Sequence, residues 1–169
     1  YEQEQERRRI AESLRDVLTM LNSDAPLRQT LRDVLQTACA LLGADAAVIS
    51  SVNEAKAHIT LEASVGLPET MAEISSLPLV ETPPNQATLA ARPFVVPNIA
   101  NYYTQHVREI NAMNAASQTW LRQVEAHFGA YLSVPLLIKD TVYGDITLYY
   151  HDGRAFDEEL ISLAEPFGS

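Results

Sequence analysis

The side chains best suited to hold a small molecule lie near the end of this sequence. In residues 141–150, polar and aromatic side chains alternate with aliphatic ones, so a strand would place Tyr143, Asp145, Thr147 and Tyr149 on one face. Such a face either meets solvent or lines a wet cavity. A carboxylate buried there would need a partner or a ligand, because an unpaired buried charge is costly.

A second group of hydrogen-bonding aromatic residues lies upstream, in a polar segment. Tyr102, Tyr103 and His106 collect there without an apolar periodicity that would make them core residues. The apolar residues that follow recur at the spacing of one helical edge: Trp120, Leu121, Val124 and Phe128. These apolar residues are either core anchors beneath a solvated polar face or part of a cover over a cavity.

The sequence has no pattern that favours catalysis or metal binding. It contains no Gly-rich phosphate loop, nucleophile elbow or metal-spaced cluster of His and Asp. Its single cysteine, Cys39, can form neither a disulfide within the chain nor a Cys-cluster zinc site. We therefore predict no enzymatic turnover and no metal site. His106 or His127 could act as an axial haem ligand, which keeps a haem-type sensor as one alternative.

Two apolar runs near the C-terminus predict an antiparallel hairpin. Residues 130–138 and 141–150 are rich in β-branched and aliphatic side chains, and a two-residue Lys-Asp turn separates them. Downstream, Asp157 predicts the N-cap of an exiting helix over residues 158–167, because its carboxylate can accept hydrogen bonds from exposed amides.

Two further strands are predicted between residues 47 and 65. In the second of them, residues 57–65, the aliphatic side chains Ile59, Leu61 and Ala63 should share one face while polar side chains share the other. We expect this to be an edge strand whose polar face meets solvent.

The helix that precedes these strands, over residues 27–42, is predicted by apolar residues at spacings of four and three. Leu35 and Leu42 widen its apolar stripe enough to cover a sheet, and Gly43 suits a left-handed stop. Cys39 lies on the same stripe, so we predict a buried and unreactive thiol.

A charged segment ahead of this helix carries an a/d seam of aliphatic residues: Ile10, Leu14, Val17 and Leu21. Two heptads are short for a coiled coil, so ordinary packing is the other interpretation. We predict a parallel homodimer through this seam, with residues 1–24 as a coiled-coil helix and residues 25–169 as the folded domain. Because the chain starts at Tyr1 without a methionine, we expect it to be a segment of a longer protein.

The composition fits one soluble domain. The 169 residues are 47% hydrophobic and carry a formal net charge of −10, with 12 Lys and Arg residues in all. This balance disfavours a nucleic-acid partner, because affinity for a phosphate backbone depends on Lys and Arg. No apolar run approaches the length of a membrane span, and no signal-peptide pattern is present. We expect a cytoplasmic segment without membrane contact.

Five segments, in order along nearly the whole chain, resemble the GAF domain family. They are residues 31–52 with their Leu-Gly-Ala-Asp step, residues 61–68 with Ala-Ser-x-Gly-Leu-Pro, residues 90–97, the hairpin at 130–150, and the Gly-Arg-x-Phe step before the last helix. Each segment alone is common, but the five in this order are specific. The family comprises small-molecule-sensing and dimerising modules of bacterial signalling proteins and of some phosphodiesterases.

This resemblance implies an α+β fold: a central antiparallel sheet with the entering and exiting helices on one face and a helical lid, residues 101–128, on the other. It also implies that the last strand lies in the interior of the sheet and that the lid closes over a ligand. In the family, the position that Asp145 occupies here is usually aliphatic. We therefore expect a small-molecule site formed by Asp145, Thr147, Tyr149, Tyr102, Tyr103, His106 and Trp120.

The function that the resemblance implies is a regulatory ligand-sensing and dimerisation domain of a larger bacterial signalling protein. A sensor histidine kinase of a two-component system or a cyclic-dinucleotide enzyme would be a suitable host, and the identity of the ligand or cofactor stays unknown. A ligand-free structural dimerisation or spacer module is the alternative, which a packed interior would favour. Covalent bilin attachment is disfavoured because Cys39 lies on the entering helix, and the cyclic-nucleotide signature of the family is incomplete.

Overall fold

The structure of the protein is a computed structural model that describes residues 27–162. Several predicted features lie outside the described residues: the domain boundary at residue 24, the last part of the exiting helix, and the seam of Ile10, Leu14, Val17 and Leu21. The coiled coil and the homodimer accordingly stay predictions.

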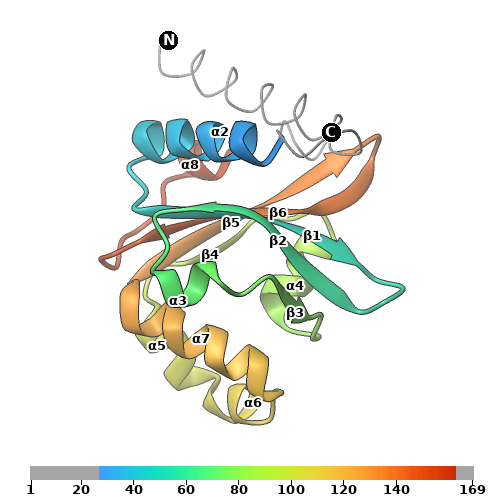
Figure 1. The fold of residues 1–169 in the computed structure, drawn as a ribbon. Coiled ribbons are helices and arrows are strands. Elements are labelled where there is room, and N and C mark those ends of the chain that lie inside the picture. The colour runs from blue at the N-terminus through green and yellow to red at the C-terminus, as the bar shows by residue number, and fades with distance from the viewer. Residues whose placement is uncertain (1–26, 163–169) are drawn as a thin grey trace.

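A six-stranded antiparallel sheet forms the centre of the domain (Figure 1). Its strands are β1 Ala46–Asn53, β2 His58–Val65, β3 Ser76–Pro78, β4 Phe94–Val96, β5 Ala130–Ile138 and β6 Thr141–Tyr150. They lie side by side in the order β3-β2-β1-β6-β5-β4, which makes β6 a central strand. The predicted α+β class is confirmed. The prediction of β2 as an edge strand is wrong, because the short β3 pairs along its outer side.

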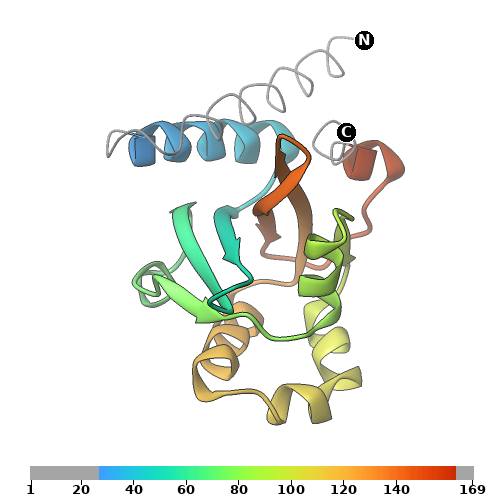
Figure 2. The same ribbon diagram turned by 90° about the vertical axis from the view of Figure 1, so that its right-hand side faces the viewer.

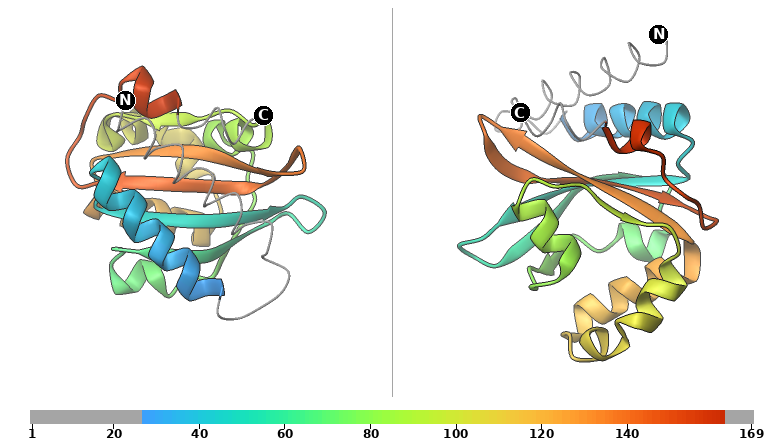
Figure 3. Two further views of the ribbon diagram at one scale, coloured as in Figure 1. Left: turned by 90° about the horizontal axis from the view of Figure 1, so that it is seen from above. Right: turned by 180° about the vertical axis from the view of Figure 1, so that it is seen from behind.

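Two helices cover one face of the sheet, which we call the helix face (Figures 1 and 3). α2 (Leu27–Leu42) runs diagonally across the strands, and the short α8 (Glu158–Ile161) covers the same face. Gly43 follows α2 with a φ of 70°, which confirms the predicted left-handed stop. The buried stripe of α2 consists of Leu31, Leu35, Ala38 and Leu42.

Two further predictions concern this layer: the N-cap of α8 and the burial of Cys39 on α2. The Asp157 carboxylate accepts a hydrogen bond from the Leu160 amide at 2.7 Å, which confirms the predicted N-cap of α8. Cys39 is only partly buried, contrary to the expectation of full burial. Burial, and after it the nearby Asp45 carboxylate, still raises the pKa of the Cys39 thiol to about 11.

The opposite face, which we call the pocket face, carries the other helices of the described residues (Figures 1 and 2). These are α3 Glu69–Ala72, α4 Pro83–Leu89, α5 Ile99–Gln105, α6 Val107–Asn111 and α7 Ala115–His127. Because α5, α6 and α7 all come from the predicted lid, its position opposite α2 and α8 is confirmed. The lid, which we call the cover from here on, consists of these three separate helices. On the same face, α4 comes from a different segment of the chain and packs beside the sheet.

The predicted hairpin of β5 and β6 is present and turns at Lys139 and Asp140. Their φ angles of 49° and 64° are left-handed, as the two central residues of a type I′ turn require. Such a turn matches the twist of the two strands and fixes their register. The register in turn decides which side chains of β6 face the cover.

Two β-bulges change which side chains share a face. In β6, the pairing skips Tyr143, which therefore packs against the helix-face core, so its predicted grouping with Asp145 is wrong. In β2, the pairing skips Glu62, so Ala63 joins the helix-face core while Leu61 stays on the pocket face. The predicted common face of Ile59, Leu61 and Ala63 is therefore wrong for Ala63 alone, since Ile59 and Leu61 both lie on the pocket face. Each extra residue shifts the two-residue alternation by one.

Candidate ligand-binding site

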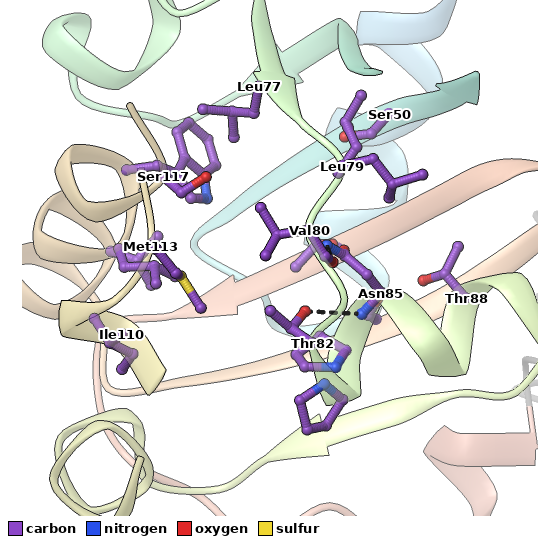
Figure 4. A pocket seen from close by; sticks show the side chains of 18 of the residues that line it. Ser50, Leu77, Leu79, Val80, Thr82, Asn85, Thr88, Ile110, Met113 and Ser117 are labelled. Carbon is purple, nitrogen blue, oxygen red and sulfur yellow. Dashed lines mark hydrogen bonds between the residues drawn. The ribbon is translucent and has the colours of Figure 1, made fainter. Parts of the chain in front are cut away.

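A cavity of about 630 Å³ lies between the pocket face of the sheet and its cover. Strands β1, β2, β5 and β6 supply its floor. Its walls come from α4, from α5 to α7, and from residues 79–82, which link β3 to α4 and which we call the strap (Figures 2 and 4). A volume of this size with a few polar groups in an apolar lining is typical of sites for small organic molecules.

All seven residues predicted for the site line this one cavity. The members on the central strand are Asp145, Thr147 and Tyr149. The members on the cover are Tyr102, Tyr103, His106 and Trp120. The fold thus brings the two predicted groups together across a single space, and their role in binding a ligand is taken up as a proposal below.

Asp145 lies on the cavity floor, where the fold holds one of its two carboxylate oxygens. The Thr88 hydroxyl on α4 donates to Oδ2 at 2.9 Å, and the Ser133 hydroxyl on β5 donates to the same oxygen at 3.2 Å. Within the described part of the chain, no donor forms a hydrogen bond with Oδ1. Asp145 is partly accessible, and it borders the cavity.

The environment of Asp145 makes its charge costly. Burial raises the pKa of its carboxyl to about 6, and the hydrogen bonds from Thr88 and Ser133 offset only part of that shift. The carboxylate is therefore largely ionised at pH 7, but it is held in a state that a further donor or a positive charge would stabilise. A buried acid of this kind is a feature of functional sites.

Three buried tyrosines in the cavity lining keep their phenol protons at neutral pH. Burial is the main cause that raises the pKa of Tyr103, Tyr131 and Tyr149, and neighbouring tyrosines add to it. The Asp145 charge contributes further for Tyr131 and Tyr149. These hydroxyls can therefore donate as well as accept at neutral pH. The Trp120 side chain acts in the opposite direction and lowers the pKa of Tyr149, because an indole N–H can only donate.

The two histidines named as possible haem ligands differ in position. His106 lines the cavity, stacks on Tyr102 with ring centroids 4.2 Å apart, and places Nδ1 at 2.8 Å from the Tyr102 carbonyl oxygen. Since a carbonyl only accepts, this contact assigns the proton to Nδ1 and leaves Nε2 as an acceptor or a metal ligand. His127 is exposed at the end of α7 and does not line the cavity, so it is unsuitable.

The large apolar side chains of the predicted lid do not fill the cavity. Phe128 is buried and stacks on Tyr149 with centroids 4.9 Å apart, so it is a core anchor. Trp120 is partly buried in the same cluster and also borders the open space. A packed interior, which would have favoured a spacer module, is therefore not what the structure contains.

The sequence-based prediction missed one complete wall of the cavity. Leu79 and Val80 of the strap line the cavity, and Val80 lies on the side of Met113 and Ile110 (Figure 4). A half-buried apolar run ahead of a Pro-Pro pair was the signal that could have identified the strap. Ser133 was also missed, although it is the one polar residue in an otherwise apolar strand.

The chain belongs to the GAF domain family, whose family model, described as "GAF domain", matches residues 24–169. This membership confirms the resemblance found in the sequence. No curated protein matches the chain at a significant level. Among the residues that the structure describes, no helix is long and apolar enough to cross a membrane, and no cluster of three or more His, Cys, Asp or Glu could hold a metal ion.

Solved GAF domains share the fold at low sequence identity. The domain from a phosphoenolpyruvate-protein phosphotransferase of Coxiella burnetii has a TM-score of 0.61 and 18% identity, over 91% of this chain and 84% of that one. The phycoerythrobilin-bound domain of a cyanobacterial phytochrome has a TM-score of 0.59 and 16% identity, over 98% and 94%. The second GAF domain of DevS from Mycobacterium smegmatis has a TM-score of 0.55 and 20% identity, over 82% and 84%.

Proposed function

We propose that this domain is a regulatory sensor that binds a small organic molecule in the cavity between the sheet and the cover. The observation that carries the proposal is the half-satisfied Asp145 carboxylate on the floor of a cavity of about 630 Å³. A protein that needed this domain only as a spacer would gain stability from an aliphatic side chain there, because a buried charge with incomplete partners is costly.

The geometry suggests how occupancy could reach the helices on the far side of the sheet. Thr147 and Tyr149 face the cavity, whereas Ile146 and Leu148 of the same strand pack in the helix-face core. Next to Tyr149, the Tyr150 hydroxyl donates to the Leu42 carbonyl at the end of α2. A ligand that prefers one position of β6 would therefore also favour one packing of α2.

The wider setting follows from the family. We propose that the domain forms a homodimer through the seam predicted in residues 1–24 and that it has no enzymatic turnover of its own. We further propose that it regulates an output module in a larger cytoplasmic signalling protein of bacterial type, such as a sensor kinase or a cyclic-dinucleotide enzyme. The similar solved domains from a phosphotransferase and a phytochrome support such a setting.

The three alternatives have narrower support. A spacer module would be expected to fill the cavity with its own side chains, and this cavity is open. A haem-type sensor would depend on His106 alone, because His127 lies outside the cavity lining. Covalent bilin attachment lacks a thiol at the site, since Cys39 packs on the helix face.

Native mass spectrometry of the protein purified without denaturation tests the sensor proposal. We expect a retained small molecule, or a library compound that raises the melting temperature, in the wild type. Thr147→Phe would place a bulky ring on the cavity floor beside Asp145 and should abolish or strongly weaken binding. Thr141→Phe is the matched control, because Thr141 is exposed on the same strand and outside the cavity. A wild type that neither retains nor binds any compound would favour the spacer.

A further inference from the structure

Tyrosines aside, the ionisable side chains that line the cavity are three carboxyl groups and one histidine. Three carboxyl groups line it: Asp145 on the floor, and Glu81 and Glu109, which are exposed and so lie at its rim. His106 also lines the cavity. No Lys or Arg among residues 27–162 is part of the lining. An anionic ligand such as a phosphate ester or a carboxylic acid would therefore meet repulsion without a compensating cation.

The second observation is the vacant hydrogen-bonding capacity of Asp145. Thr88 and Ser133 both donate to Oδ2, and Oδ1 receives no hydrogen bond from the described residues. An ionised carboxylate can only accept hydrogen bonds, so a ligand placed here must offer a donor. A donor that carries a positive charge forms the shorter and stronger bond.

The third observation is the aromatic character of the walls. Five aromatic side chains line the cavity: Tyr102, Tyr103, Trp120, Tyr131 and Tyr149. The faces of such rings are negative and attract organic cations, more strongly when the site excludes water. Carboxylates and aromatic faces thus favour the same ligand charge, by two independent interactions.

We infer that the cavity takes an organic cation, a ring-sized molecule whose protonated amine or amidine nitrogen donates to Asp145 Oδ1. This inference rests on the proposed sensor function and adds the chemical class of the ligand. The ring of the ligand lies among the tyrosines, and the acidic rim of Glu81 and Glu109 attracts it from solvent.

Binding of a cation is linked to the protonation of Asp145. Its pKa of about 6 in the empty domain means that the carboxylate loses its charge as the pH falls below that value. The groups that face it from β5, β6 and α4 are hydroxyls: Ser133, Tyr131, Tyr149 and Thr88. Tyrosines aside, His106, Glu109 and Glu81 are the ionisable groups that line the cavity from the cover and the strap, so an Asp145 variant is needed to isolate the contribution of Asp145.

The test compares three probes of one shape and different charge: benzamidine, which is a cation at neutral pH, benzamide and benzoate. Trp120 is the single tryptophan of the chain and lines the cavity, so its fluorescence reports binding at this site. We expect benzamidine to bind at least about tenfold more tightly than benzamide, because its bond to Asp145 is charge-assisted, and benzoate to bind most weakly. Between pH 7 and pH 5 its affinity should fall about tenfold.

Asp145→Asn keeps the shape and an acceptor for Thr88 but removes the charge. In this variant the benzamidine and benzamide constants should agree within about threefold, and the acid-side loss of affinity should disappear. Glu73→Gln is the matched control, because it removes an exposed carboxylate outside the cavity lining, and it should keep the preference for benzamidine.

Two contrary outcomes have different meanings. Equal or tighter binding of benzamide or benzoate, or a preference for benzamidine that survives in Asp145→Asn, overturns the cationic class and leaves the sensor proposal intact. The same holds if none of the three probes binds while another compound raises the melting temperature of the domain. If no compound at all changes the Trp120 emission or the melting temperature, the sensor proposal itself fails.

Discussion

The two faces of the central sheet use the same strands and are packed in opposite ways. On the helix face, Leu132, Val134, Ile146 and Leu148 meet the leucine stripe of α2 in a continuous buried core. On the pocket face, the neighbouring residues of the same strands are Tyr131, Ser133, Asp145 and Thr147, and they border open space. The comparison teaches that one face provides stability, while the other keeps polar groups and volume that stability alone would remove.

The largest expected effect comes from truncating one leucine on each face. Leu35 is fully buried, so Leu35→Ala should cost about 3 kcal/mol of the free energy of unfolding through lost burial and a new cavity. Leu61 is half-buried and lines an existing cavity, so Leu61→Ala should cost less than about half as much. Urea unfolding followed by circular dichroism measures both. Equal losses would mean that the two faces are packed alike.

The next effect concerns the charge of Asp145. Its pKa is about 6 in the folded domain and lower in the unfolded chain, so the folded state holds the proton more tightly. Its contribution to stability is therefore greatest below pH 4 and is lost as the pH rises through about 6. Asp145→Asn removes this loss and should stabilise the domain at pH 7 by up to about 3 kcal/mol, with the difference from wild type vanishing near pH 4.

Thermal unfolding of both proteins across this pH range measures the difference. Asp145→Leu serves as a control for the hydroxyl partners, because Thr88 and Ser133 would lose their common acceptor. It should gain less stability than Asp145→Asn, by about 1 kcal/mol. A difference between wild type and Asp145→Asn that does not change with pH would contradict the raised pKa.

A smaller effect, on reactivity, is expected for the thiol on the helix face. With a pKa of about 11 against an ordinary 9.0, Cys39 should contain about a hundredfold less thiolate than a free cysteine at the same pH. Its labelling by a disulfide reagent should therefore be much slower in the native protein than in urea. Because the side chain is partly exposed, rapid native labelling would show that the raised pKa does not protect it.

Much of the positioning of the site could be predicted because it depends on residues close in sequence. The alternation along β6 placed Asp145, Thr147 and Tyr149 on one face, and the hairpin turn and the caps at Gly43 and Asp157 follow from local backbone preferences. Aromatic residues without helical periodicity indicated that the cover does more than pack. These signals need no knowledge of distant contacts.

The remainder was decided by tertiary structure. Tyr143 and Ala63 leave their expected faces because each strand must match the register of its neighbour, and that register cannot be read from one strand alone. The strap becomes a wall only because β3 pairs with β2. Thr88 reaches Asp145 across 57 positions of sequence. The sequence by itself determined the fold class and the common face of Asp145, Thr147 and Tyr149, since these follow from period and local chemistry. Only the folded chain decided that a cavity remains beneath the cover and that one oxygen of Asp145 receives no hydrogen bond from residues 27–162, because long-range packing sets both.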